Sequence, residues 1–227
     1  MNEFDLVIFD CDGVLIDSEI ISARMLVAEL GRLGLAIDLA YVERHFLGRS
    51  YPVVMETIRR DFGLDLPPGF EAQYRESLLA AFRDDLTIVP HVREVLEGIG
   101  VPFCVATSSS PRRAEMSLDL VGLTALVGDR LFTSTMVARG KPAPDLFLFA
   151  AERMGVLPDR TLVIEDSLTG IRAGLAAGMT VWRFVGGSHL GPDAPEEPPD
   201  ARPHRRLASF AEFFQIAPGL KSARAPA

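Results

Sequence analysis

The pattern of hydrophobic and polar positions divides the chain into two parts. Residues 19–83 carry apolar side chains at helical spacing, interrupted by glycine and proline, and contain no strand pattern. From about Leu86 onward, short apolar runs alternate with amphipathic segments. This alternation predicts an α/β fold with a parallel sheet and right-handed crossovers.

Each run gives an expected element, bounded by the glycines, prolines and polar clusters around it. In the first part we expect helices at 19–33, 40–46, 51–62 and 70–82. In the second part we expect strands at 101–107, 130–134, 161–165 and 180–185, and helices at 111–121, 143–154, 169–177 and 208–215. One more strand is expected at 4–9, where a short apolar run is typical of a buried parallel strand. Because it belongs with the later strands, the helical block is expected to be an insertion after it.

Three segments lack a periodic pattern. The charged run at 83–85 predicts an exposed linker, and residues 186–204 form a proline-rich loop. Residues beyond Pro218 are expected to be a disordered tail.

Composition limits the partners and the compartment. The 227 residues have a net charge of −8 and a pI near 5.1, which argues against nucleic acid or an anionic membrane as the main partner. Neither a signal peptide nor a bilayer-spanning run is evident, and Cys11 and Cys104 fall inside apolar strands. We therefore expect reduced, buried thiols in a cytoplasmic protein, which we take to be a monomer.

Polar residues stand where the expected strands end. Asp10 and Asp12 follow the first strand, with Gly13 behind them to let the backbone turn sharply. Alternate residues of an extended chain point the same way, so both carboxylates can face one site. Thr107 ends the next strand and is followed by Ser108. Buried carboxylates at such a strand end are costly unless something positive meets them there.

Two further strand ends carry charged residues. Lys141 follows the strand at 130–134 within G-K-P-A-P-D, and only it and Lys221 are lysines among the 23 basic residues. Glu165 and Asp166 end the strand at 161–165. In open α/β sheets, ligands bind at the carboxyl ends of the strands, near the point where the strand order reverses. Four such signals together indicate a binding or catalytic site at that edge.

Each signal also has a purely structural explanation. A D-x-D-G sequence can be an ordinary turn, and Lys141 can be an exposed lysine in a proline turn. Residues before the expected helices can be N-caps, the candidates being Asp17, Ser18, Ser110, Asp166 and Ser167. Four independent signals at one edge of the sheet nevertheless favour a functional site.

Four ordered motifs carry a resemblance to a known family. They read D-C-D-G-V-L-I-D-S, A-T-S-S-S, G-K-P-A-P-D and I-E-D-S-L-T-G-I-R-A-G-L-A-A-G-M. They resemble those of the haloacid dehalogenase-like hydrolases, in the subgroup with a helical cap after the first motif. The resemblance implies a Rossmann-like parallel sheet in the order 5-4-1-2-3 with an inserted all-α cap domain. The core domain would comprise residues 1–16 and 86–227, and the cap domain residues 17–85.

The resemblance also implies catalytic roles. Asp10 would be the nucleophile that forms an aspartyl phosphate, and Asp12 the general acid and base. Thr107 would bind the phosphoryl oxygens, and Lys141 would offset the charge shared by nucleophile and phosphate. It further makes the Lys141–Pro142 peptide a candidate for the cis isomer.

The same resemblance implies a Mg²⁺ cofactor, because several acids around a phosphate would repel it without a cation. Its ligands would be Asp10, Asp12 through the backbone carbonyl, Asp166, and Glu165 directly or through water.

Candidate substrate contacts lie mainly in the cap. The loop L-G-R-S at 47–50 would bring Gly48, Arg49 and Ser50 toward the substrate, and Ser108 is a further candidate in the core. The alternative for Arg49 is an exposed arginine after a glycine turn. His45 and His189 are weaker candidates.

The function expected from these residues is Mg²⁺-dependent hydrolysis of a small phosphorylated metabolite, a sugar or sugar-acid phosphate. A dehalogenase is disfavoured because that branch lacks the second aspartate of the first motif, which is Asp12 here. Two alternatives stay open: a phosphosugar mutase, and a binding module on a retired enzyme scaffold. The mutases of the family have a cap histidine where Ser22 stands and use cap lysines, and residues 19–83 contain no lysine.

Overall fold

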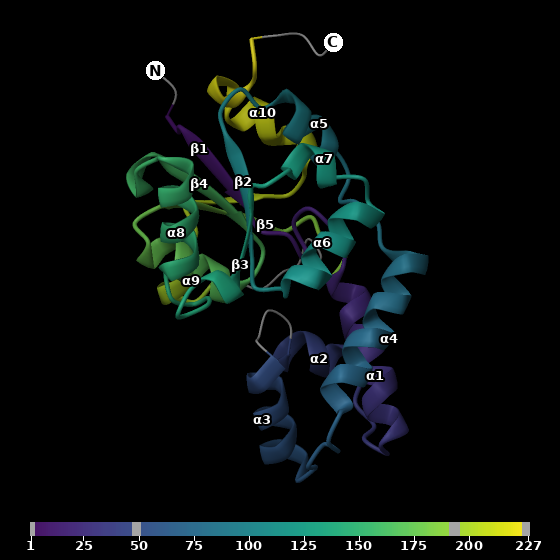
Figure 1. The fold of residues 1–227 in the computed structure, drawn as a ribbon. Coiled ribbons are helices and arrows are strands. Elements are labelled where there is room, and N and C mark those ends of the chain that lie inside the picture. Colours follow the sequence, from purple (N-terminus) through teal and green to yellow (C-terminus); the bar gives the residue numbers. More distant parts are fainter. Residues whose placement is uncertain (1–2, 47–50, 191–195, 224–227) are drawn as a thin grey trace.

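Six parallel strands form the sheet at the centre of the computed structural model, which describes residues 3–46, 51–190 and 196–223 (Figure 1). The strands are β1 (Leu6–Phe9), β2 (Phe103–Thr107), β3 (Leu131–Thr133), β4 (Thr161–Glu165), β5 (Thr180–Phe184) and β6 (Arg205–Leu207). Their order is β3-β2-β1-β4-β5-β6. The expected order 5-4-1-2-3 is thus confirmed for five strands, and it is extended by a sixth that the sequence did not predict.

Strand β1 lies in the middle of this sheet, and all four of its residues are buried. Burial on both faces explains why the strand reads as a continuous apolar run. Parallel pairing aligns Phe9 with Val105 of β2 and with Ile164 of β4. The carboxyl ends of these three strands therefore meet at one edge, and the strand order reverses between β1 and β4.

Helices cover both faces of the sheet (Figure 1). One face packs against α5 (Val92–Gly98), α6 (Pro111–Leu120), α7 (Thr124–Val127) and α10 (Phe213–Ile216), and the other against α8 (Asp145–Met154) and α9 (Leu168–Ala176). Alternate residues of β1 point to opposite faces, so Val7 and Phe9 join the first cluster, and Leu6 and Ile8 the second.

The inserted segment forms a block of four helices at one end of the molecule (Figure 1). They are α1 (Glu19–Arg32), α2 (Leu39–His45), α3 (Tyr51–Phe62) and α4 (Phe70–Asp85). Side chains from all four helices build an apolar cluster of their own around Leu30 and Ile58. A smaller cluster of α1 and α4 residues, including Leu78 and Phe82, also contacts Met116 of α6 and so joins the block to the sheet layer.

The sequence missed or misjudged five local features. It did not predict β6, α5 or α7, which are three, seven and four residues long. Two of the three β6 residues are exposed, so no alternation marks that strand. The linker expected at 83–85 is wrong, because these charged residues form the last turn of α4. The disordered tail beyond Pro218 is also wrong up to residue 223, because Leu220 is buried and Ile99 bridges to Lys221.

Three smaller expectations can be checked directly. Cys11 and Cys104 are buried free thiols, and burial raises the pKa of Cys104 to about 12, which keeps that thiol protonated and unreactive. The Lys141–Pro142 peptide is cis. Within the described ranges, no helix is both long and apolar enough to cross a bilayer.

The C-terminal helix α10 is expected to contribute to global stability, because Phe213 is fully buried against the rings of Phe9 and Trp182. Substituting Phe213→Ala removes this ring and should lower the free energy of unfolding by about 3–5 kcal/mol in a denaturant titration. The neighbouring Gln215→Ala change, at an exposed position of the same helix, should stay within about 0.5 kcal/mol. Equal effects of the two changes would contradict this packing role.

Candidate active site

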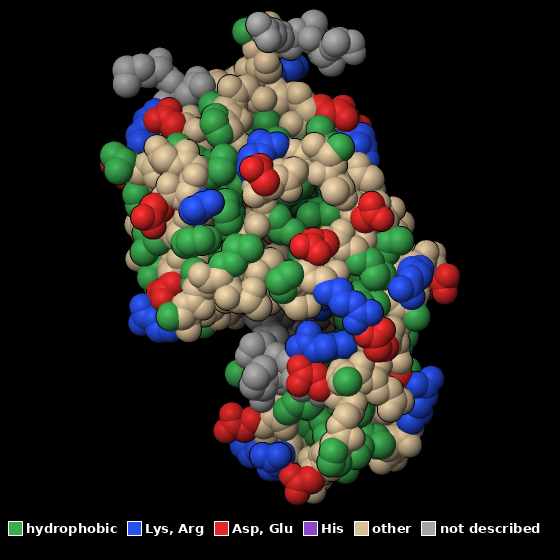
Figure 2. Space-filling view, in the orientation of Figure 1, with side chains coloured by type: hydrophobic (Ala, Val, Ile, Leu, Met, Phe, Trp, Pro, Cys, Tyr) green, Lys and Arg blue, Asp and Glu red, His purple; other side chains and the backbone are tan. Residues whose placement is uncertain are grey.

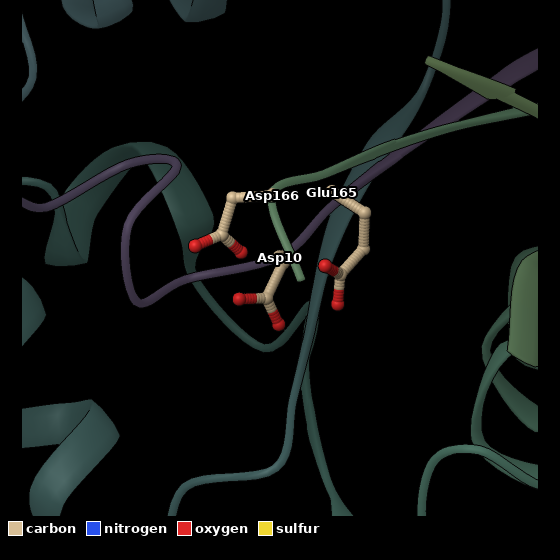
Figure 3. Close-up of side chains that lie close together, drawn as sticks. All are labelled: Asp10, Glu165 and Asp166. Atoms are coloured by element: carbon tan, nitrogen blue, oxygen red, sulfur yellow. The ribbon is translucent and has the colours of Figure 1, made fainter. Parts of the chain in front are cut away.

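Three buried carboxylates meet at the strand edge (Figure 3). Asp10 follows β1, while Glu165 and Asp166 come from the end of β4, and one oxygen of each lies within 4.8 Å of the others. All three residues are buried. Carboxylates at this spacing and burial repel one another strongly, so the cluster requires positive charge.

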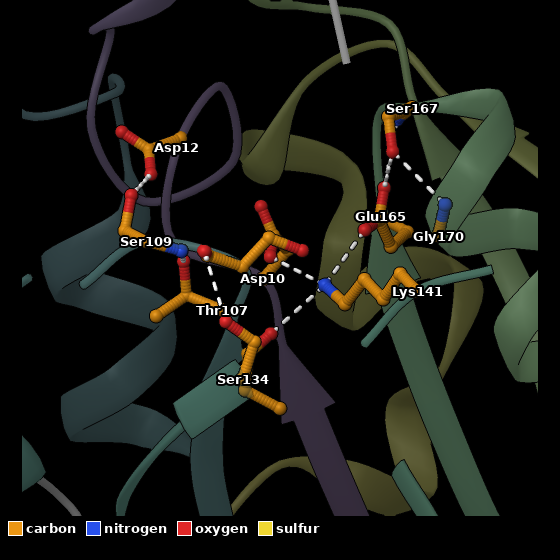
Figure 4. Close-up of polar contacts among 11 residues, drawn as sticks. Asp10, Asp12, Thr107, Ser109, Ser134, Lys141, Glu165, Ser167 and Gly170 are labelled. Carbon is orange, nitrogen blue, oxygen red and sulfur yellow. Dashed lines mark hydrogen bonds and ion pairs between the residues drawn. The ribbon is translucent and has the colours of Figure 1, made fainter. Parts of the chain in front are cut away.

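Lys141 supplies one positive charge (Figure 4). Its Nζ lies 2.6 Å from Oδ1 of Asp10 and 2.9 Å from Oε1 of Glu165, and it also donates to the carbonyl of Ala106 at 3.0 Å. The side chain is only 2% exposed, so the alternative of a surface lysine is excluded. Burial lowers the pKa of Lys141, but the two carboxylates outweigh it and leave the pKa above its ordinary value, so the ammonium stays charged.

One lysine does not neutralise three acids. Burial raises the pKa of Asp10 well above its usual range against the pull of Lys141, and Glu165 and Asp166 raise it further. The pKa of Glu165 is raised by burial and by Asp166, with Lys141 opposing. A hard divalent cation prefers carboxylate oxygens of this kind, so the donor set fits the expected Mg²⁺.

The start of α9 makes room for Glu165. Ser167 caps this helix, since its hydroxyl accepts from the amide of Gly170 at 3.0 Å, and the capping alternative for Ser167 is confirmed. The Ser167 amide and hydroxyl also donate to Oε2 of Glu165, at 2.7 and 3.0 Å (Figure 4). A Cβ on Gly170 would lie 1.7 Å from Oε1 of Glu165, so only glycine fits at this position.

The carboxylate of Asp12 is not part of the three-acid cluster. Its Oδ1 accepts from Ser18 at 2.6 Å and from Arg113 at 2.7 Å, and its Oδ2 accepts from Ser109 at 2.5 Å. Burial raises the pKa of Asp12, but Arg113 and the two serine hydroxyls outweigh it, so the net pKa lies below its ordinary value. This orientation leaves the backbone carbonyl as the only means by which Asp12 would serve a metal in the cluster.

Three capping expectations are wrong, and two of the three side chains have other partners. Ser18 occupies the N-cap position of α1, yet its side chain makes no capping bond and donates to Asp12 instead. Asp17 accepts from the amide and hydroxyl of Ser188, at 3.1 and 2.8 Å. Ser110 also stands at an N-cap position, that of α6, without a capping bond from its side chain.

His189, expected only as a weak candidate for substrate contact, pairs with one of the three acids. Its Nε2 lies 2.8 Å from Oδ2 of Asp166, and both side chains are buried. Gly13, with φ +74°, lies under this pair, because its Cβ would come within 2.3 Å of the Asp166 carboxylate and 2.8 Å of the His189 ring. Arg113 was missed altogether. Neither residue belongs to a recognisable motif, and only the fold shows their partners.

A cavity of about 470 Å³ opens from the cluster toward the helical block. On the core side it is lined by Asp10, Asp12, Thr107, Ser108, Lys141, Glu165 and Asp166, among others. Thr107 is buried and its hydroxyl accepts from the amide of Ser109 at 3.0 Å. Figure 2 shows Lys and Arg side chains gathered at the waist between the two parts of the molecule.

The structure tests only one of the candidate substrate contacts from the helical block. Gly48, Arg49 and Ser50 lie outside the described residues, so their contact with substrate stays a prediction. His45 does not line the cavity and stacks on Tyr41, with 4.3 Å between the ring centroids.

The family is shown by comparison with known proteins. Residues 4–178 match the model of the haloacid dehalogenase-like hydrolases. The chain therefore belongs to this family, as the four motifs indicate.

Similar proteins specify the class of reaction. A 6-phosphogluconate phosphatase of Escherichia coli is 28% identical over 225 residues, which is 99% of this chain and 97% of that protein. A fructose-1-phosphate phosphatase of Escherichia coli is 33% identical over 76% of this chain and 92% of its own length. A crystal structure of a family hydrolase from Deinococcus radiodurans, with bound phosphate and sodium, is 35% identical, covers 99% of this chain and 100% of that one, and has a TM-score of 0.78. Together these matches identify the chain as a phosphoric monoester hydrolase.

Removing the Lys141 ammonium should make stability depend on pH. In Lys141→Met, measured in EDTA at pH 8, two buried carboxylates lose their partner, and the free energy of unfolding should fall by about 3–5 kcal/mol. Without the lysine the folded-state pKa values of Asp10 and Glu165, already raised, rise further above their unfolded values. Groups with raised pKa values stabilise the folded state at low pH and lose that contribution as the pH rises.

The stability difference between Lys141→Met and the native chain should therefore shrink as the pH is lowered from 8 to 5. Lys221→Met, which removes the other, exposed lysine, is the matched control and should show a small change that is independent of pH. A loss that is the same at both pH values would contradict the ion-pair description.

Proposed function

We propose that this hydrolase is a Mg²⁺-dependent phosphatase of small phosphorylated metabolites, sugar or sugar-acid phosphates, that works through an aspartyl phosphate on Asp10. The observation that carries the proposal is the buried cluster of Asp10, Glu165 and Asp166 around Lys141 at the base of a cavity. The named substrates of the relatives, 6-phosphogluconate and fructose 1-phosphate, support the substrate class. In this proposal residues 1–16 and 86–227 are the core domain and residues 17–85 the cap domain.

Asp10 acts as the nucleophile. Its carboxylate lies at the floor of the cavity, where Lys141 holds Oδ1 at 2.6 Å and leaves Oδ2 to attack phosphorus. Lys141 also offsets the negative charge that builds up as nucleophile and phosphoryl group approach. The Thr107 hydroxyl, at the end of the neighbouring strand, donates to a phosphoryl oxygen.

Asp10, Asp166, Glu165 and the carbonyl of Asp12 would hold the Mg²⁺ ion. When bound, Mg²⁺ supplies the positive charge that lets a phosphate dianion approach several carboxylates.

Asp12 moves the protons. With Arg113, Ser109 and Ser18 around it, the carboxylate is kept ionised, which is the form that accepts a proton from the water that hydrolyses the aspartyl phosphate. In the preceding step Asp12 gives a proton to the leaving oxygen, and it must take up that proton against the influence of Arg113.

The contacts of Asp12 favour a phosphatase over a mutase. Ser22 stands where the family's mutases have a histidine, and its hydroxyl donates to the Ser18 carbonyl at 3.0 Å rather than to Asp12. Among the described residues, the side chains that donate to Asp12 are two serines and Arg113. A retired binding module is disfavoured because the acidic and lysine positions of the motifs are all filled by side chains capable of the chemistry.

Hydrolysis of p-nitrophenyl phosphate tests the proposal. We expect phosphate release with Mg²⁺, loss of activity in EDTA, and recovery when Mg²⁺ is restored. Asp10→Asn should lower kcat by more than about a thousandfold, because the nucleophile is lost. Asp129→Asn, an exposed aspartate change, is the control and should leave kcat unaltered. Activity that persists in EDTA or in Asp10→Asn, with deamidation excluded by mass spectrometry, would contradict the proposal.

The phosphatase and mutase alternatives give different products. Incubation with a hexose 1-phosphate and a trace of the 1,6-bisphosphate should yield no hexose 6-phosphate, because nothing in the described contacts of Asp12 resembles the mutase arrangement. Any reaction should instead release free sugar and inorganic phosphate, and chromatography of the products measures both. Efficient formation of the 6-phosphate would establish a mutase.

A further inference from the structure

One carboxylate that lines the cavity has no hydrogen-bond or ion-pair partner among the described residues. Glu19 begins α1, where the chain passes from the sheet edge into the helical block, and it lines the cavity. No residue in the described parts of the chain donates a hydrogen bond to it or forms an ion pair with it. Asp12, by contrast, has three donors close by. Glu19 therefore has acceptor capacity that no residue in the described ranges uses.

Glu19 lines the same cavity as the expected reacting groups and is close enough to feel their charge. Burial raises the pKa of Glu19 to about 7, with Asp12 and Asp166 acting in the same direction and Arg113 and His189 opposing. An unpaired carboxyl group at such a position costs free energy unless a ligand satisfies it. A carboxylate also repels a phosphate dianion, so its presence here suits a ligand that donates hydrogen bonds nearby.

The cavity walls differ in polarity. The helical block contributes an apolar wall made of Leu26, Phe46, Val54, Leu78 and Leu79. The side toward the start of α1 is polar and contains Glu19, Ser22 and Arg113. The phosphoryl end lies at Asp10 and Lys141. A carbon chain or ring with hydroxyl groups on one side and C–H groups on the other fits these walls.

The charge near Glu19 suits a neutral hydroxyl as its donor. The Arg113 guanidinium lies 2.7 Å from Asp12 and 3.4 Å from the Ser22 hydroxyl, and its charge also acts on Glu19. Because this positive charge already offsets part of the charge of Glu19, the carboxyl group lacks a hydrogen-bond donor rather than a second cation.

We propose that Glu19 is a specificity-determining residue that accepts a hydrogen bond from a substrate hydroxyl close to the phosphate ester. The inference rests on the proposed phosphatase activity and narrows its substrate class to phosphate esters of polyols and sugars that keep this hydroxyl. Alkyl phosphates and esters deoxygenated next to the phosphate are then poor substrates.

A matched pair of three-carbon esters, glycerol 3-phosphate and propyl phosphate, tests the inference. The native chain should prefer glycerol 3-phosphate in kcat/KM. In Glu19→Met, which has a similar shape and cannot accept a strong hydrogen bond, the preference should fall by about 10- to 100-fold, and in Glu19→Gln by less. Comparing the two esters on each variant cancels their different leaving groups. For an ester turned over too slowly, its inhibition constant against p-nitrophenyl phosphate replaces kcat/KM.

Two controls accompany the pair. Glu152→Gln, an exposed change on α8, should leave the preference unaltered, and thermal melting should show that the Glu19 variants are folded. If Glu19→Met is unfolded, Glu19→Gln decides the test. A reduced preference for glycerol 3-phosphate in Glu19→Gln supports the role of Glu19, and an unchanged preference overturns it.

The possible outcomes separate the two proposals. An unchanged preference in the Glu19 variants, or a native preference for ethanolamine phosphate over glycerol 3-phosphate, would overturn the role of Glu19 while leaving the phosphatase intact. Absence of Mg²⁺-dependent hydrolysis of p-nitrophenyl phosphate by the native chain would overturn the proposed function and this inference with it.

Discussion

The ion pairs of the Lys141 ammonium are the interaction on which the site depends. Three buried carboxylates at the ends of two neighbouring strands would repel one another and attract water, and neither is compatible with a close-packed sheet edge. Lys141 reaches them from the loop between β3 and α8 and contacts Asp10 and Glu165 at once. The remaining excess of negative charge suits a divalent cation, and the three acids stay close enough to share one.

The sequence predicted the parts of the fold that depend on local pattern. Strands β1, β2, β4 and β5 are short, apolar and bounded by breakers, so their existence and order followed from the chain and its motifs. Strand β6 and helix α5 were not predicted because each is short. Strand β6 is also mostly exposed, so that only its pairing with β5 defines it. The charged end of α4 shows the reverse error, since charge alone does not end a helix.

For the candidate site, the sequence indicated the residues at strand ends but not their tertiary partners. Asp10, Lys141 and Glu165 converge because a parallel sheet brings strand ends to one edge. Arg113 contacts Asp12 across a separation of 101 residues, and His189, which contacts Asp166, lies in an irregular loop. No periodicity in the sequence encodes either contact. The sequence did not single out Glu19 as a site residue, because a glutamate in the first turn of a helix is common.

The central claim is that Asp10, held by Lys141, receives the phosphoryl group. The most direct measurement is a single turnover stopped with acid, followed by proteolysis and mass spectrometry of the peptides that carry phosphate. We expect one acid-stable, alkali-labile phosphoryl group on the carboxylate of Asp10, and none in Asp10→Asn. A phosphoryl group on Ser109, or rapid turnover with no phosphorylated peptide under conditions that trap acyl phosphates, would contradict it.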